Sequence, residues 1–223
     1  MQTDLRENNI VTLVGKIVSE YNFSHEMYGE AFYIFNIEVN RLSEAIDTLP
    51  VMISERLIDK NLFKIGALIE INGQIRSYNN IVDNKNHLVL TVFAKELSFN
   101  LDFNKNPNQV CLNGYVCKPP VYRKTPFGRE IADVLLAVNR SYNKSDYIPC
   151  IIWGRNAKFA NSLEVGNNLK ICGRMQSRNY QKKLENGEVL EKTAYEVSVS
   201  KLEVLDLNQN IQSDIEDKSY IAL

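Results

Sequence analysis

The chain has 223 residues, of which 44% are hydrophobic and 24% charged, and its formal net charge is −1. This length suits one or two globular domains. No apolar run approaches the ~20 residues that a membrane-spanning helix needs, and the polar, acidic start from Met1 to Glu7 is not a secretory signal. We therefore expect a cytoplasmic protein that does not contact a membrane.

The sequence contains a long internal repeat. Residues 9–17, NIVTLVGKI, are similar to residues 108–116, NQVCLNGYV, and the Val-Asn-Arg tripeptide at 39–41 returns at 138–140. Solenoid units run ~20–50 residues, so a repeat this long is a whole domain. We predict a first domain over 1–101, a linker over 102–107, a second domain over 108–205 and a short acidic tail over 206–223.

The first half alternates apolar and polar residues in five segments, which predicts five strands over 11–18, 31–39, 49–53, 67–75 and 88–93. One helix is predicted between the third and fourth strands, over 55–63. Ser54 is a good N-cap for it, and Gly66 is a natural stop. Ile58, Leu62 and Ile65 recur there at helical spacing.

The second half repeats this order, with strands predicted over 110–117, 131–140, 147–153, 168–178 and 193–205 and a helix over 156–163. Turns are indicated by Pro126-Phe127-Gly128 and by Asn186-Gly187. Glycines within the first and fourth strands of each half indicate bends or bulges, at Gly15, Gly73, Gly114 and Gly173. We predict an all-β fold: two tandem five-stranded OB-fold Greek-key barrels, each with one short helix between strands 3 and 4.

Charge is distributed unevenly along the chain. Residues 1–106 carry −4, residues 107–205 carry +6 and residues 206–223 carry −3. A basic second domain between two acidic segments suggests that one half meets a polyanion. The alternative is a solvated charged face that binds nothing.

Four cysteines lie in apolar, strand-like segments of the second half: Cys111, Cys117, Cys150 and Cys172. None forms a Cys-x-x-Cys pair, and the two histidines, His25 and His87, are distant from all of them. We expect small buried residues, reduced in the cytosol, and neither a metal site nor a cofactor.

Aromatic and cationic residues are interleaved in the second half, a mixture that suits single-stranded nucleic acid. Cations follow phosphates, and rings stack on bases regardless of sequence. A tyrosine in a small barrel can equally pack or hydrogen-bond at an edge. The candidates are Tyr122, Arg123, Lys124, Arg129, Arg140, Tyr142, Tyr147, Trp153, Arg174, Arg178, Tyr180 and Lys182.

Tyr147 and Trp153 stand six residues apart on one predicted strand, and even spacing points both to the same face. Ile148, Cys150 and Ile152 would then face the core. Pro149 could bulge the strand and break this parity.

Residues 108–205 resemble the bacterial single-stranded DNA-binding protein (SSB) family. The resemblance is carried by Thr125-Pro126-x-Gly128-Arg129, by Leu136-Ala137-Val138-Asn139-Arg140, by Ile151-Ile152-Trp153-Gly154 and by residues 173–178, GRMQSR. Residues 8–100 are similar to the same domain but more diverged.

The resemblance implies that the family's DNA-stacking aromatics fall on Tyr142, Tyr147, Trp153 and Tyr180. The first half has Ser43, Thr48 and Ser54 at three of these positions, although it retains Arg41, Arg76 and Tyr78 as candidate DNA contacts. We expect the first half to bind DNA weakly or to serve assembly.

The resemblance further implies a non-enzymatic protein that binds single-stranded DNA during replication, repair or recombination, and a homodimer with four OB-folds. The short tail, with Asp214, Glu216 and Asp217 before Tyr220, is either a reduced docking tip for replication or repair proteins or a frayed terminus. Two other functions stay open: a replisome or primosome adaptor that mainly binds protein, and a subunit of a nucleic-acid enzyme.

Overall fold

The computed structural model describes residues 8–41, 43–82, 85–99, 101, 107–183 and 187–205. The first half contains β1 (Asn9–Ile17), β2 (Asn22–Met27), β3 (Glu30–Asn40), β4 (Ile46–Ser54), the 3-10 helix η1 (Glu55–Leu57), β5 (Leu68–Val82) and β6 (Lys85–Ser98). The second contains β7 (Asn108–Val116), β8 (Val121–Lys124), β9 (Glu130–Arg140), β10 (Lys144–Trp153), α1 (Arg155–Ala160), β11 (Asn168–Lys183) and β12 (Val189–Val204). The predicted linker and tail lie outside the described residues, except for Pro107, and their boundaries stay predictions.

Five strands of each half close a barrel. In the first barrel, β1 pairs with both β3 and β5, β3 with β4, β5 with β6, and β4 runs parallel to β6. The second barrel repeats this ring with β7, β9, β10, β12 and β11. The predicted five-stranded order is therefore confirmed. The short strands β2 and β8 are additional hairpin arms on β3 and β9.

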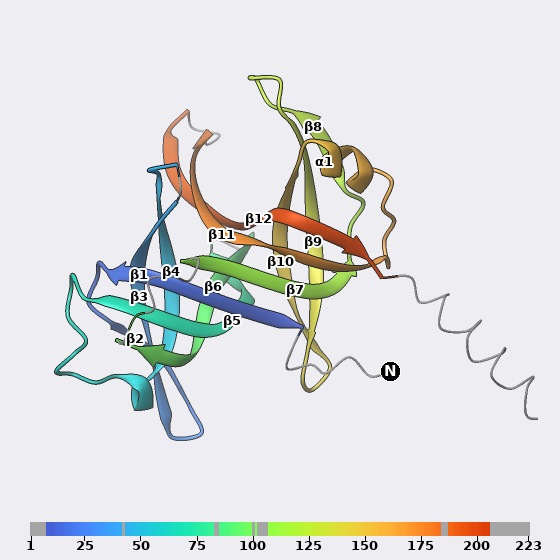
Figure 1. Cartoon of the computed structure of the whole chain (residues 1–223). Helices are drawn as coiled ribbons and strands as arrows, with labels where there is room; N and C mark the ends of the chain where they lie inside the picture. The colour runs from blue at the N-terminus through green and yellow to red at the C-terminus, as the bar shows by residue number, and fades with distance from the viewer. Residues whose placement is uncertain are drawn as a thin grey trace, which may run out of the picture.

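The barrels share one continuous sheet because β1 and β7 pair antiparallel, from Asn9 opposite Leu112 to Leu13 opposite Asn108. Figure 1 shows these two strands side by side at the middle of the molecule, with the other strands of each barrel on either side. Alternate residues of both strands, such as Leu13 and Leu112, point into the core. Burying a side chain of this size contributes ~1.5–3 kcal/mol.

The fourth strand of each barrel is bulged at its glycine. Register shifts occur between Asn72 and Gly73 and between Cys172 and Gly173. A Cβ atom at either glycine would lie 2.1 Å from a carbonyl oxygen of the neighbouring strand, on Phe93 or Ser198. Only glycine allows this approach, so the predicted bulges are confirmed and repeat in both copies.

The helix prediction is wrong for the first barrel. Ser54 does cap a helix, accepting a 3.2 Å hydrogen bond from the Arg56 amide, but that helix is one 3-10 turn rather than residues 55–63. Leu62 and Ile65, which supplied the helical spacing, are 49% and 57% exposed, and Phe63 enters the core instead. The second barrel has a true α-helix, α1, shifted from the predicted 156–163 and burying Ala157 and Ala160.

Two of the four cysteines are joined, which contradicts the expectation of reduced thiols. Cys111 and Cys172 face each other on β7 and β11, with Cα atoms 4.2 Å apart, and form a disulfide. Cys117 and Cys150 are free. Burial raises the pKa of the Cys150 thiol, which keeps it in the unreactive protonated form. Among the described residues, no helix is both long enough and apolar enough to cross a membrane.

Candidate nucleic-acid interface

Strand β10 presents two aromatic rings on the outer face of the second barrel. Its register with β9 runs without a shift through Pro149, opposite Leu135. Ile148, Cys150 and Ile152 consequently point into the core, whereas Tyr147 is 45% exposed and Trp153 half-buried. The prediction that Tyr147 and Trp153 lie on the same face of this strand, opposite the core, is confirmed.

Trp153 is held in place by the neighbouring strand. Its indole Nε1 donates a 3.1 Å hydrogen bond to Ser198 Oγ on β12, which runs parallel to β10. This bond satisfies the polar edge of the indole and fixes the ring's orientation. The chain's one tryptophan is therefore part of the outer face rather than of the core.

Strand β11 adds arginines and a third ring to the same face. Arg174, Gln176, Arg178 and Tyr180 alternate along it, and Arg174 pairs with Ser198, the residue opposite Ile151 of β10. The Arg178 guanidinium lies 5.8 Å from the Tyr180 ring centroid and its Nε 3.6 Å from the Glu196 carboxylate. Arg178 nonetheless stays half exposed. Together, β10, β12 and β11 make a face with three rings and two arginines.

Tyr142 lies in the turn between β9 and β10. It has a φ of 62° and its side chain is 93% exposed. Positive φ is uncommon for a non-glycine residue, and no core contact explains the ring's position. Such an exposed ring is available to a ligand.

The β8 hairpin carries four predicted contacts, two of which have partners within the protein. Burial and a hydrogen bond with Glu130 raise the pKa of Tyr122. The Arg123 guanidinium binds Asp133 with both Nε, at 2.8 Å, and Nη2, at 3.3 Å. Lys124 and Arg129 are exposed. The side chain of Lys182, on β11, lies outside the described part of the chain.

Arg41, Arg76 and Arg140 lie where the two barrels meet. Arg41 binds the buried Asp47 carboxylate through Nε at 2.7 Å and Nη2 at 2.5 Å, which raises the pKa of Arg41. Arg76 and Arg140 approach the buried Asp146 at 3.0 and 3.7 Å. We call this region, defined by Asp47, Asp146 and the residues that bind them, the seam.

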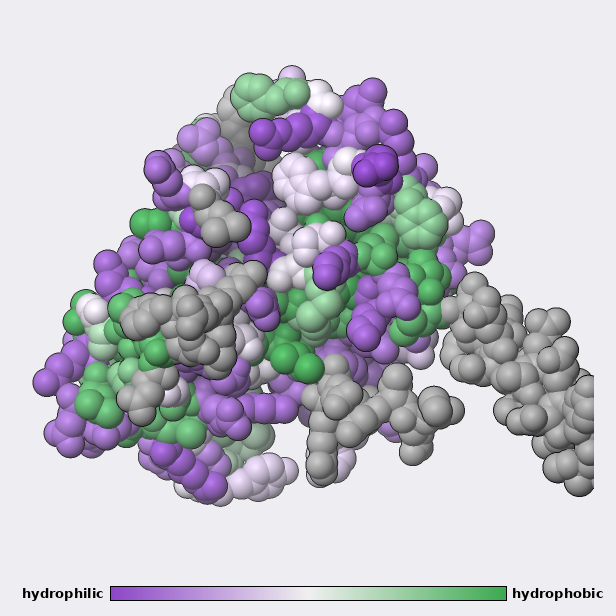
Figure 2. Space-filling view, viewed as in Figure 1, coloured by the Kyte–Doolittle hydropathy of each residue, from purple (hydrophilic) through white to green (hydrophobic). Residues whose placement is uncertain are grey.

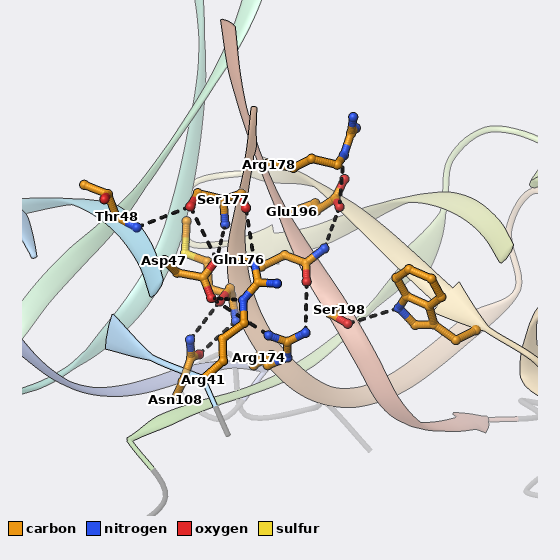
Figure 3. Close-up of polar contacts among 12 residues, drawn as sticks. Arg41, Asp47, Thr48, Asn108, Arg174, Gln176, Ser177, Arg178, Glu196 and Ser198 are labelled. Carbon is orange, nitrogen blue, oxygen red and sulfur yellow. Dashed lines mark hydrogen bonds and ion pairs between the residues drawn. The ribbon is translucent and has the colours of Figure 1, made fainter. Parts of the chain in front are cut away.

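Two serines that the sequence analysis did not select complete the seam. Asp47 Oδ1 accepts a 2.7 Å hydrogen bond from the Ser177 amide, and Ser177 Oγ accepts one from the Thr48 amide at 3.2 Å (Figure 3). The same arrangement occurs a second time with the barrels exchanged, so that the aspartate is on the second barrel and the serine on the first. Asp146 accepts a hydrogen bond from the Ser77 amide at 2.8 Å, and Ser77 Oγ accepts one from the Tyr147 amide at 2.7 Å. The first barrel therefore anchors the backbone of Tyr147. The two aspartates stand at equivalent positions of the sequence repeat, and so do the two serines. This repetition is the sequence feature that could have identified them.

The first barrel presents a different face. Ser43 and Thr48 are exposed, and Ser54 donates to Glu30, so none offers a ring. A pocket of 610 Å³ opens on this barrel, and its walls combine Met27, Met52, Tyr78 and Phe93 with polar side chains such as Asn80. Arg76 also lines it and lies 5.9 Å from the Phe93 ring centroid. This barrel has no aromatic ring at the three equivalent positions, but it has a pocket of mixed polar and apolar lining that includes two rings.

The surface of the molecule is mainly hydrophilic. Figure 2 shows hydrophilic side chains over most of the face in view, with apolar side chains gathered in patches over both barrels.

Comparison with known proteins identifies close relatives of the second half. Residues 107–205 match the model of the single-strand binding protein family. The chain is 40% identical over 81 residues to "Single-stranded DNA-binding protein 1" of Staphylococcus aureus, covering 33% of this chain and 48% of that protein. It is also 40% identical over 81 residues to "Single-stranded DNA-binding protein A" of Bacillus subtilis, covering 33% and 47%. The chain thus spans about half the length of these relatives, and the resemblance stated above is confirmed.

A solved structure matches both halves together. The wild-type single-stranded DNA binding protein from Thermus aquaticus superposes with a TM-score of 0.70, covering 89% of this chain and 93% of that one. At 21% sequence identity, this likeness establishes the fold: two OB-fold barrels in tandem.

Proposed function

We propose that the chain binds single-stranded DNA without sequence preference, in replication, repair or recombination, because residues 107–205 match the model of the single-strand binding protein family. One observation carries the proposal. Tyr147, Trp153 and Tyr180 lie on a single outer face of the second barrel, with Arg178 beside them. We further propose that the protein is not an enzyme and acts in the cytoplasm, at the nucleoid.

The chemistry of this face suits a flexible, unpaired strand. A base stacked on an aromatic ring contributes ~1–3 kcal/mol whatever its identity, since every base has a π-face. Lys124 and Arg129 are exposed in the β8–β9 hairpin of the same barrel, and each cation that neutralises a phosphate releases a counterion. Rings and cations together predict tight binding with little sequence preference.

Titration with oligo-dT tests this function. Trp153 is the only tryptophan, so its fluorescence reports stacking on the second barrel alone. We expect quenching on binding, and an affinity that falls as salt rises, with a slope of ~0.7 per phosphate contact in a plot of log K against log salt. Unchanged fluorescence together with no gel shift at micromolar protein would refute the proposal.

Assembly is a separate proposal. The family relationship supports a homodimer with four barrels, and the acidic tail is proposed to dock replication or repair proteins. Sedimentation equilibrium should give twice the chain mass of 25.6 kDa. A monomer at all concentrations would contradict the dimer without affecting DNA binding.

A further inference from the structure

The seam contains two pockets that are built from both barrels. The larger, of 360 Å³, is lined by Arg41 and Ser43 of the first barrel and by Asn108, Arg174 and Ser198 of the second. The smaller, of 190 Å³, is lined by Gln74, Arg76 and Lys95 of the first and by Asn139, Arg140 and Ser141 of the second. We call them the large and the small seam pocket.

The internal repeat relates the two pockets. Asn40 and Arg41 of the large pocket occupy the positions of Asn139 and Arg140 in the small one. Their carboxylates correspond as well, since Asp47 and Asp146 stand at equivalent repeat positions. The second arginine of each pocket is not repeated, because Gln74 stands at the position of Arg174 and Gln176 at the position of Arg76. The repeat therefore preserves one arginine and one aspartate on each side of the seam.

Each pocket holds more positive than negative charge. Arg41 is bound tightly to Asp47, whereas Arg174 Nη1 lies 3.9 Å from the same carboxylate. In the small pocket Arg76 is the closer partner of Asp146, at 3.0 Å, and Arg140 the more distant, at 3.7 Å. One carboxylate thus binds two guanidinium groups in each case, and in the large pocket Glu196 attracts Arg41 as well.

The more distant arginine of each pair also has an unused donor. Arg174 Nη1 and Arg140 Nε are buried and have no hydrogen-bond partner among the described residues. A buried donor without a hydrogen-bond partner destabilises the fold, and more so when it is charged. Burial, together with repulsion from Arg41, lowers the pKa of Arg174. An anion bound in the pocket would accept a hydrogen bond from the unused donor and would reduce the repulsion between the two arginines.

We propose that each seam pocket binds one backbone phosphate of a single strand where the strand crosses from one barrel to the other. The inference rests on the proposed function. Both pockets adjoin aromatic rings. The large pocket includes Ser198, which holds Trp153. The small pocket shares Arg76 and Arg140 with the 610 Å³ pocket, which Tyr78 and Phe93 line. Guanidinium groups match phosphate geometry with paired donors.

Guanidinium NMR of the full chain, with ¹⁵N-labelled arginine, tests the proposal directly. Oligo-dT is titrated in one arm and inorganic phosphate in the other, and the Nε–Hε signals of Arg140 and Arg174 are followed. We expect oligo-dT to shift both signals at concentrations that quench Trp153, and inorganic phosphate to shift them only weakly. The contrast separates a strand phosphate from a free anion.

Variants supply the second readout. Arg174→Gln and Arg140→Gln each leave the closer arginine on its aspartate, so the seam should stay folded. Each is expected to lower the slope of log K against log salt by ~0.7, and Arg174→Lys should restore it. Arg155→Gln, on the exposed start of α1, is the matched control and should leave the slope unchanged.

The outcomes distinguish the two proposals. Quenching of Trp153 without a shift of either arginine signal, and with unchanged slopes in both variants, overturns the seam pockets while DNA binding stands. Absence of any oligo-dT binding overturns both proposals. A response to inorganic phosphate that equals the response to oligo-dT shows a general anion site and overturns the strand crossing.

Discussion

The two barrels share their strand order, their bulged glycines and their half of the seam, but they differ on the outer face. Where the second barrel has Arg174, Glu196 and Ser198, the equivalent positions of the first are Gln74, Thr91 and Phe93. Duplication has thus preserved the residues that hold the barrels together more strictly than those that face solvent. Architecture and ligand chemistry can diverge within one chain because they depend on opposite faces of the same strands.

Removing a seam carboxylate should have the largest effect. Asp47→Ala and Asp146→Ala each leave two arginines without their buried partner. Breaking a buried pair on one side costs ~3–5 kcal/mol, and because these arginines are partly exposed we expect about 3 kcal/mol of lost unfolding free energy. Urea denaturation measures it.

Asp133→Ala is the control for this prediction. Its partner Arg123 is exposed, and exposed ion pairs contribute ~0–1 kcal/mol. If Asp47→Ala or Asp146→Ala cost no more than this control, the seam would not be what joins the barrels.

Loss of a stacking ring should reduce the free energy of DNA binding, by no more than the unfolding free energy that is lost when a seam carboxylate is removed. Tyr142→Ala and Tyr180→Ala in the second barrel should each reduce affinity for oligo-dT by ~1–3 kcal/mol. Tyr78→Ala in the first barrel should cost less than ~1 kcal/mol, because that barrel has no ring at the positions equivalent to Tyr142, Tyr147 and Trp153. Oligo-dT titration with an unchanged thermal midpoint isolates the binding effect. Equal losses in both barrels would erase the distinction between them.

A ring can also be added to the first barrel. Thr48 is exposed at the position equivalent to Tyr147, and both backbone amides bind a seam serine. Thr48→Tyr should therefore tighten oligo-dT binding by about 1 kcal/mol, at the low end of one stacked base. Thr48→Val is the matched control. No gain would indicate that the strand does not reach this part of the first barrel.

The smallest effect is expected on the β8 hairpin. Arg123→Gln removes a cation already bound to Asp133, so stability should change by less than ~1 kcal/mol and the salt slope by at most ~0.7. A loss of affinity comparable with that of Tyr180→Ala would place this hairpin at the centre of the interface instead.

Strand order and face could be predicted because they follow from local alternation. The parity of Tyr147 and Trp153 is fixed by period two, and Pro149 does not disturb it since its register with Leu135 is regular. The helix over 55–63 could not be excluded, because Leu62 and Ile65 have helical spacing yet remain exposed. Periodicity records which residues are apolar, not which are buried.

Contacts between distant residues were beyond local patterns. Asp47 meets Ser177 across 130 positions, and Cys111 meets Cys172 across 61. Register across β1, β7 and β11 decides both contacts. The aspartates and serines were visible as repeated residues, but their meaning required the two barrels to be placed together.

Photocrosslinking tests most directly whether the second barrel carries the DNA. Oligo-dT with 5-iodo-deoxyuridine at single positions is irradiated with the full chain, and the crosslinked residues are identified by mass spectrometry. We predict that most adducts form on Tyr142, Tyr147, Trp153 and Tyr180. Adducts concentrated on Tyr78 and Phe93 of the first barrel, with the second barrel unmodified, would contradict this account.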